Sequence, residues 1–206
     1  MTTCIEIGAN WGIDTEIYAQ KYDKVYAFEP VKELTNNLWE KFKDYNNVII
    51  IPFAIDLTNG FKDFNVSTEY DWGCSSLFEF SDNLKEDWVP DSDFWRGDFF
   101  HNYSYKVPTI TLYDFVTLYD INQIDFLHID AQGNDLNVLK SLKDKLNIVQ
   151  SGVMECNCKM DLYKNTSNRL EDSIEFLTSN NFIITKGNIQ SEGNEINLEF
   201  KQVIYK

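Results

Sequence analysis

The sequence predicts an α/β fold with a mostly parallel seven-stranded sheet, an antiparallel last strand and helices on both faces. Apolar runs alternate with helical segments along most of the 206 residues, which is typical of a parallel sheet. A turn with two glycines follows the first apolar run, as in nucleotide-binding α/β folds. The chain ends in two strand-like segments around a polar turn, a pattern that predicts a hairpin.

The expected elements follow in order from the hydrophobic pattern and from the turn residues between apolar runs. Strands are expected at residues 3–7, 24–28, 47–53, 124–129 and 148–155, and in the terminal pair 182–185 and 197–205. Helices are expected at residues 15–21, 32–42, 114–119, 136–142 and 166–180. The run at 47–53 is continuously apolar, as in strands that are buried on both faces of a sheet.

A single domain over residues 1–206 is the simplest organisation, with one aromatic-rich insertion at about residues 57–106. This stretch is too long for an ordinary connection, and Phe, Tyr and Trp recur along it between Asp and Ser. We expect most of these rings to form a satellite core and two or three to contact substrate, with residues 72–77 folding over the cofactor.

The loop after the first expected strand carries the main functional signal. Gly8 and Gly12 flank Asn10, and such a turn lets backbone approach a ligand while the following helix points amides at it. Glu29 ends the second expected strand, 21 residues beyond Gly8, a spacing at which an acidic residue meets a ribose. The pattern therefore predicts a cofactor that contains a nucleoside.

The same loop distinguishes between cofactors. A dinucleotide fingerprint needs a third glycine for the pyrophosphate, and Ile13 stands at that position. The loop has no lysine or arginine, whereas Glu6 and Asp14 add negative charge near it. A cationic or zwitterionic ligand is therefore favoured over a diphosphate, which makes an NAD-type oxidoreductase the less favoured enzyme class. Glu6 interrupts an apolar strand, so it either holds loop amides or contacts the amino group of the cofactor.

Four segments resemble one enzyme family. IEIGANWG at 5–12 and AFEP at 27–30 resemble the first two motifs of S-adenosylmethionine-dependent methyltransferases. VPTITLYDF at 107–115 and IDFLHIDAQGND at 124–135 resemble the FkbM subfamily in particular. The resemblance covers about residues 4–142, with Glu155 as a further match. It departs from the family at His128, Gln132 and Asn134, where a lysine, a glutamate and a small residue are usual.

The resemblance implies a Rossmann-like class I methyltransferase fold, S-adenosylmethionine as cofactor, and O-methylation of a hydroxyl on a sugar, glycan or small molecule. Ligands of open α/β sheets bind beyond the carboxyl ends of the strands. The residues that we expect to contact the cofactor lie at such ends or in the motifs: Glu6, Gly8, Asn10, Gly12, Glu29, Pro30, Asp56, Ser76 and Asp130. Asp56 follows the third expected strand, where it could accept a hydrogen bond from an adenine amino group.

A hydroxyl acceptor needs a base to remove its proton as the methyl group is transferred. Asp130 is the first candidate because it ends an apolar strand beside the expected position of the methyl group. It could instead orient the amino group of the donor. The two histidines are the other candidates: His101 in the insertion and His128 in the strand before Asp130. A histidine inside a strand is more often a hydrogen-bonded core residue.

Oxygen ligands at two strand ends raise the question of a metal. Asp130, Glu155 and Asn157 could together bind Mg²⁺, although carboxylates at strand ends are also common caps. The expectation is that no metal is required.

Composition limits the partners and the compartment. A net charge of −15 disfavours a nucleic-acid partner, because phosphate binding needs clustered lysine and arginine. No apolar run is long enough to cross a bilayer. The four cysteines form no disulfide framework, which favours a cytoplasmic protein with reduced thiols. The expected partner is a small-molecule or glycan acceptor, and the alternative is a catalytically silent S-adenosylmethionine-binding or assembly domain.

Overall fold

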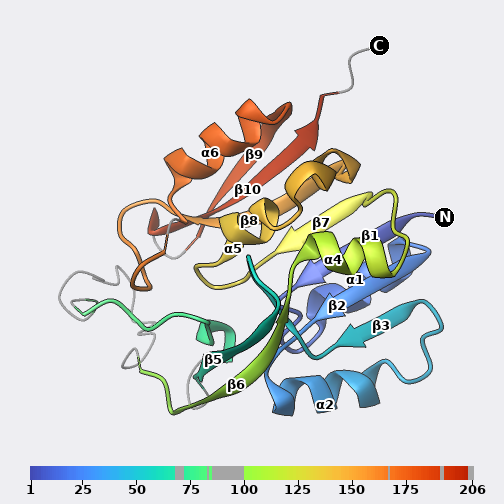
Figure 1. The fold of residues 1–206 in the computed structure, drawn as a ribbon, viewed down its shortest axis with the longest axis horizontal. Coiled ribbons are helices and arrows are strands. Elements are labelled where there is room, and N and C mark those ends of the chain that lie inside the picture. The colour runs from blue at the N-terminus through green and yellow to red at the C-terminus, as the bar shows by residue number, and fades with distance from the viewer. Residues whose placement is uncertain (68–71, 83, 85–99, 167, 191–192, 204–206) are drawn as a thin grey trace.

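The computed structural model describes residues 1–67, 72–82, 84, 100–166, 168–190 and 193–203 (Figure 1). Five aromatic residues of the expected insertion lie outside the described residues: Tyr70, Trp88, Phe94, Trp95 and Phe99.

The chain forms two β-sheets, with helices between the strands. The strands are β1 (Thr3–Ile7), β2 (Lys24–Phe28), β3 (Val48–Ile51), β4 (Ala54–Ile55), β5 (Gly60–Val66), β6 (Tyr103–Ile110), β7 (Phe126–Ile129), β8 (Ser151–Asn157), β9 (Phe182–Gln190) and β10 (Glu195–Gln202). The α-helices are α1 (Ile13–Lys21), α2 (Lys32–Lys41), α4 (Leu112–Leu118), α5 (Asp135–Lys140) and α6 (Leu170–Ser179). Two 3₁₀ helices, η1 (Trp72–Cys74) and η2 (Lys143–Ile148), complete the described elements.

The larger sheet has seven strands in the order β3-β2-β1-β7-β8-β10-β9, as Figure 1 shows. Strand β1 pairs in parallel with β2 on one side and β7 on the other, so the carboxyl ends of these three strands lie together. The last strand, β10, is antiparallel to both neighbours and lies between β8 and β9. The predicted fold class, with its mostly parallel sheet and antiparallel last strand, is confirmed.

Helices cover both faces because successive strand residues point to opposite sides of the sheet. Phe28 of β2 packs in the main core with Phe115 of α4 and Leu136 of α5. Its neighbour Ala27 packs in a separate cluster that contains Leu38 of α2. Figure 1 shows α4, α5 and α6 in front of the sheet.

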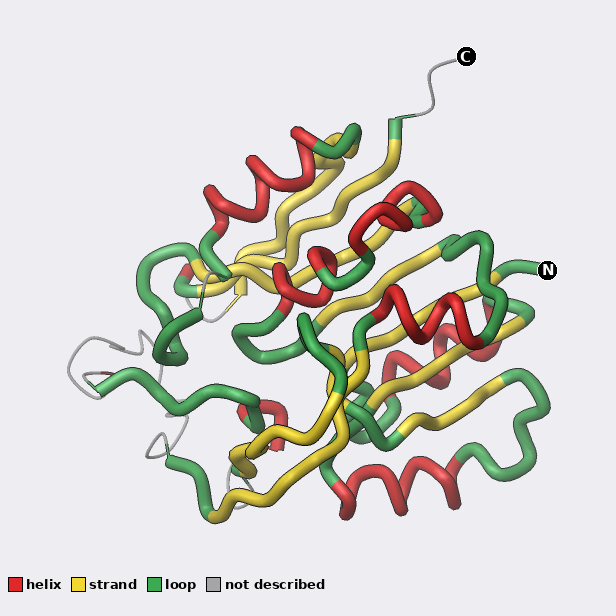
Figure 2. Tube along the Cα trace, in the orientation of Figure 1, coloured by secondary structure: helices red, strands yellow, loops and turns green. Residues whose placement is uncertain are grey.

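The expected insertion contains a second sheet that the sequence analysis did not anticipate. β6 pairs antiparallel with β5 and parallel with β4, which gives three strands in the order β4-β6-β5. Figure 2 shows this small sheet beside the large one. Its inner residues Phe64 and Val107 pack with Leu34 of α2, and Trp72 and Tyr105 cover this second cluster. These described rings therefore lie in a satellite core, as expected for most of the insertion.

Among the described residues, no helix combines the length and the apolar character that a bilayer crossing requires.

Phe115 is the central ring of the main core and gives a test of the fold. It lies 4.8 Å from the Phe28 ring and 5.3 Å from the Tyr26 ring, both edge-to-face. Phe115→Ala should lower the free energy of unfolding by about 3–5 kcal/mol, because it leaves a cavity. Leu118→Ala on the same helix is the control; Leu118 is 74% exposed, so the expected change is within about 0.5 kcal/mol. Urea denaturation of both variants measures the difference, and equal losses would contradict the packing.

Candidate functional site

The loop between β1 and α1 is held against the ends of two neighbouring strands. The Gly8 and Ala9 amides both donate to the carbonyl of Phe28, at 3.0 and 2.9 Å. The backbone φ is 87° at Gly8, 49° at Asn10 and 70° at Gly12, so the predicted turn uses the left-handed region three times. A Cβ on Gly8 would lie 2.0 Å from the Asp130 carbonyl oxygen, so no other residue fits there.

A cavity opens at the carboxyl ends of β1, β2 and β7, where ligands of open α/β sheets bind. It is lined by Ile7, Gly8, Asn10, Phe28, Glu29, Pro30, Phe53, Ala54, Ile55, Phe64, Trp72, Gly73, Ser75, Leu77, Asp130, Ala131, Gln132 and Asn134. Among the described residues, the lining is largely apolar, contains two carboxylates and has no lysine or arginine.

Glu29 is the most constrained polar residue of this cavity. Its Oε2 accepts a hydrogen bond from the Asn10 amide and its Oε1 accepts one from the Val31 amide, both at 2.8 Å. The side chain is 4% exposed, and burial raises its pKa to about 7. Burial has the largest effect on this pKa. The two amides lower the pKa, and nearby Asp130 raises it by a smaller amount. The carboxylate is thus fixed in orientation while it still lines the cavity.

Gln132 joins the two acidic strand ends on the other side of the cavity. Its side-chain amide donates to Oδ1 of Asp130 at 2.5 Å and to Oε2 of Glu155 at 3.2 Å. The Tyr163 hydroxyl donates to Oε1 of Gln132 at 2.8 Å, which fixes the amide with its nitrogen toward the carboxylates. One neutral donor group therefore bridges two carboxylates.

Five of the predicted cofactor residues line the cavity: Gly8, Asn10, Glu29, Pro30 and Asp130. Gly12 instead caps the start of α1, and Ser76 lies behind the wall, where its hydroxyl donates to the Gln132 carbonyl at 2.7 Å. Asp56 forms an ion pair with Lys62 and is also absent from the lining.

His101 lies apart from the cavity. Its ring stacks on Phe80 at 4.1 Å, and both rings line a different hollow that also contains Tyr103. Phe80 in turn stacks on Tyr163 at 5.2 Å, and His101 is hydrogen-bonded to the backbone of Cys74, which lies between the lining residues Gly73 and Ser75. His101 is not among the residues that line the cavity, whereas Asp130, the other candidate base, is.

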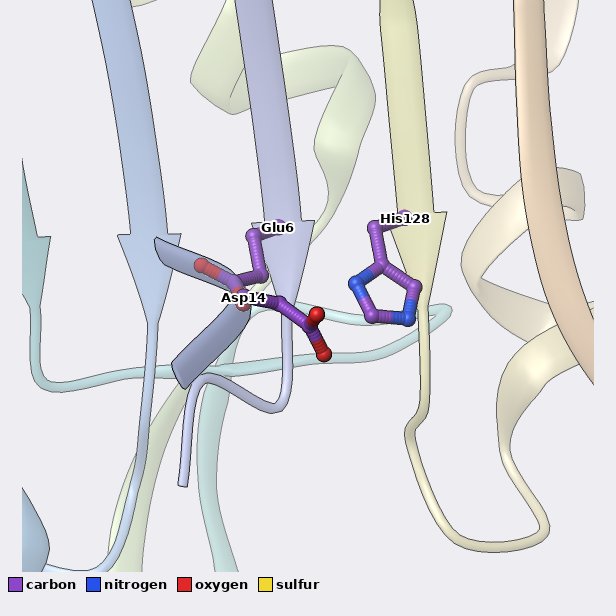
Figure 3. Close-up of side chains that lie close together, drawn as sticks. All are labelled: Glu6, Asp14 and His128. Carbon is purple, nitrogen blue, oxygen red and sulfur yellow. The ribbon is translucent and has the colours of Figure 1, made fainter. Parts of the chain in front are cut away.

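Glu6 and His128 lie opposite each other on adjacent strands and do not line the cavity either. Figure 3 shows their side chains converging with that of Asp14, at the start of α1. The Thr15 hydroxyl donates to Oε2 of Glu6 at 2.6 Å, and the Tyr18 hydroxyl lies 3.1 Å from Nδ1 of His128. Burial raises the pKa of Glu6 to about 8 and lowers the pKa of His128.

The three residues weighed as Mg²⁺ ligands lie at the carboxyl ends of β7 and β8. Asp130 and Glu155 are joined through the Gln132 amide, whose hydrogens occupy the space between them. The Asn157 side chain is buried, and its Nδ2 has no hydrogen-bond partner within the described ranges. Its backbone amide pairs with the Asn168 carbonyl.

Several lining residues were missed by sequence reasoning. Trp72 and Leu77 were expected only within a general lid, while Phe64 was one aromatic residue among many. For Gln132 and Asn134 the sequence did contain a signal, because both residues depart from the motif of the FkbM family. Asn134 donates through Nδ2 to the Ile55 carbonyl at 2.8 Å and so closes the cavity floor.

Several solved structures share the fold at low sequence identity. The TrmK protein of M. capricolum, solved with S-adenosylhomocysteine, has a TM-score of 0.52 and 12% sequence identity, and the match covers 99% of this chain and 63% of that chain. A fibrillarin/Nop5p complex has a TM-score of 0.52 and 15% sequence identity, and the match covers 98% of this chain and 73% of that chain. An rRNA methylase from Streptococcus thermophilus has a TM-score of 0.51 and 10% sequence identity, and the match covers 98% of this chain and 87% of that chain. The chain thus spans under two thirds of the first of these proteins.

The sequence comparisons give one family. No curated protein matches the sequence significantly. The family model described as the methyltransferase FkbM domain matches residues 6–184, which include the glycine loop, Glu29, Asp130 and Gln132. The match spans most of the 206 residues and confirms the resemblance seen in the motifs. The chain therefore belongs to the FkbM methyltransferase domain family.

Proposed function

We propose that this protein transfers the methyl group of S-adenosylmethionine to a hydroxyl oxygen of a sugar, glycan or other small molecule. The observation that carries the proposal is the position of Glu29. This carboxylate ends β2, lines the cavity and is oriented by the amides of Asn10 and Val31. An oriented carboxylate at this point suits the two hydroxyls of a ribose.

The charge of the cavity supports a cationic donor. Glu29 and Asp130 contribute carboxylates, and no lysine or arginine lies among the lining residues that the structure describes, so a sulfonium is favoured over a pyrophosphate. Phe53, Ile55 and Phe64 provide an apolar wall of the kind that accepts an adenine. Two proteins with the same fold, TrmK and a methyltransferase from Streptococcus mutans, were solved with S-adenosylhomocysteine.

Asp130 is the proposed base. The acceptor oxygen attacks the methyl carbon, the carbon–sulfur bond breaks to leave S-adenosylhomocysteine, and the hydroxyl proton passes to the Asp130 carboxylate. Holding donor and acceptor at attack distance supplies most of the acceleration, roughly 7–11 kcal/mol for well-oriented reactants. The Gln132 amide positions Asp130, since it donates to Oδ1 and is itself fixed by Tyr163. No metal is part of this proposal.

The acceptor is proposed from the charge and from the rings near the cavity. A net charge of −15 disfavours a nucleic acid, although one protein of similar fold is an rRNA methylase. Trp72 lines the cavity, and its ring lies 6.2 Å from that of Trp11, which is 47% exposed. Aromatic faces at a cavity mouth suit a sugar or another flat apolar surface.

We place the reaction in the cytoplasm.

The acceptor assignment is tested with a panel of sugars, glycans and small alcohols, with release of S-adenosylhomocysteine as the readout. Turnover is expected on at least one hydroxyl acceptor. Binding of the cofactor without turnover on any acceptor would favour the alternative, a catalytically silent S-adenosylmethionine-binding domain.

Glu29→Gln tests the cofactor site. We expect it to weaken S-adenosylhomocysteine binding about 10- to 100-fold, because hydrogen bonds to a charged acceptor contribute about 1.5–3 kcal/mol. Glu33→Gln removes the same charge from an exposed position in α2 and should leave the affinity unchanged. Calorimetry measures both, with circular dichroism as a check of folding. Equal affinities for wild type and Glu29→Gln would contradict the ribose contact.

The raised pKa of Glu29 predicts a pH dependence of binding. In the free protein the pKa is about 7, and ribose hydroxyls stabilise the ionised carboxylate, so the pKa should fall in the complex. Binding of S-adenosylhomocysteine should therefore release a proton near pH 6.5 and should tighten as the pH rises from about 6 to about 8. Calorimetry in buffers of different ionisation enthalpy detects the proton. Glu29→Gln should abolish the part of the release that Glu29 supplies.

Asp130→Asn separates the two roles open to this carboxylate. If Asp130 is the base, turnover should fall at least about 100-fold while affinity for S-adenosylhomocysteine stays close to wild type. A parallel loss of affinity and turnover would instead assign it to the amino group of the donor. Rates on the best acceptor of the panel and calorimetry give the two values.

A further inference from the structure

A second group of ionisable side chains lies outside the cofactor cavity, where β1, β7 and the first turn of α1 meet. One ligand atom from each of Glu6, Asp14 and His128 lies within 4.8 Å of the other two. Figure 3 shows the Asp14 side chain between those of Glu6 and His128, with its carboxylate toward the His128 ring. The strands fix two of them, since Glu6 and His128 are direct partners in the β1–β7 register.

The group lacks a positive partner. No lysine or arginine in the described ranges forms an ion pair with Glu6 or Asp14. Glu6 is 1% exposed, and only its Oε2 has a hydrogen bond within those ranges, from Thr15. A nearly buried carboxylate thus has one oxygen without a donor, next to a second carboxylate. A buried carboxylate needs either a proton or a cation to compensate its charge, so this position can accept a metal ion.

We infer that Glu6, Asp14 and His128 bind a divalent first-row transition metal ion such as Zn²⁺ or Mn²⁺. Imidazole nitrogen with two carboxylates is a ligand set that suits these ions, whereas Mg²⁺ and Ca²⁺ prefer oxygen alone. Neighbouring ligand atoms around such an ion lie about 3.0–3.4 Å apart in octahedral or tetrahedral geometry, given metal–ligand distances of about 2.1 Å. The group therefore needs to close by at most about 1.4–1.8 Å, and the exposed Asp14 side chain can supply this movement.

Neighbouring hydroxyls hold the two strand ligands in place. Thr15 donates to Glu6 at 2.6 Å, and the Tyr18 hydroxyl contacts Nδ1 of His128 at 3.1 Å. Such outer contacts orient ligands in established metal sites. Asp14 leaves the site open to solvent, which gives an ion a route of entry. A bound ion would tie β1, β7 and α1 together directly beside the glycine loop.

The test uses the full chain, stripped of metal with EDTA and then titrated separately with Zn²⁺ and Mn²⁺. We expect one ion per chain and a rise in the melting temperature, with the stoichiometry of Mn²⁺ measured by electron paramagnetic resonance. Asp14→Asn should weaken Mn²⁺ at least about tenfold. Because Asp14 is exposed, this variant should fold, and circular dichroism checks it. Glu16→Gln, on the same helix but paired with Lys41, is the matched control and should bind as wild type.

Three results would overturn the site. These are the absence of any effect of either ion on melting, equal Mn²⁺ affinity of wild type and Asp14→Asn, or equal weakening by Glu16→Gln. Binding of Ca²⁺ as tight as that of Mn²⁺ would also count against it, because it would indicate general attraction to an acidic surface. S-Adenosylhomocysteine binding in EDTA is measured in parallel, so failure of this site and failure of the proposed function remain distinguishable.

Discussion

The close approach of β1 and β7 at Gly8 is the constraint on which the site depends. A Cβ there would meet the Asp130 carbonyl oxygen at 2.0 Å, and the Asp130 amide donates to the Ile7 carbonyl at 2.9 Å. The loop can therefore turn across the strand ends only with glycine at position 8. As a result Asn10, Glu29 and Asp130, which come from three strand ends, border one cavity. Sheet packing alone requires this glycine, before any ligand is considered.

The carboxylates around this cavity are balanced by neutral donors. Backbone amides of Asn10 and Val31 hold Glu29, and the Gln132 side chain holds Asp130 together with Glu155. Hydrogen bonds from amides orient a carboxylate without cancelling its charge. The cavity therefore keeps a negative character that a sulfonium can use. A lysine or arginine in the same place would orient the carboxylates equally well but would repel the donor.

The parts of the fold set by local pattern could be predicted from the sequence, and the parts set by long-range contacts could not. Strands β1 and β2 were predicted with their observed bounds, because apolar runs with clear glycine or proline ends define them. The small sheet was missed because β5 is mostly exposed and pairs with β6 across about forty residues.

The candidate site shows the same division. Gly8, Asn10, Glu29 and Asp130 follow strand ends directly, so the rule that ligands bind there was enough to find them. Trp72 reaches the cavity through the insertion, and no periodicity in the sequence indicates that contact. His128 shares a strand face with Asp130 by alternation, yet its ring contacts Tyr18 and faces Asp14 rather than the cavity.

β7 thus separates two pairs of carboxylates that the protein treats differently. Asp130 and Glu155 share the two hydrogens of the Gln132 amide, so their mutual repulsion is relieved by a donor within the chain. Glu6 receives one hydroxyl from Thr15, and no donor or cation of the described residues contacts the Asp14 carboxylate. Gln132 and His128 both depart from the pattern of the FkbM family. Gln132 stands where a glutamate is usual and supplies a hydrogen-bond donor, and His128 stands where a lysine is usual and supplies an imidazole. The first change gives Asp130 and Glu155 a shared neutral donor, and the second gives the proposed metal site its imidazole ligand.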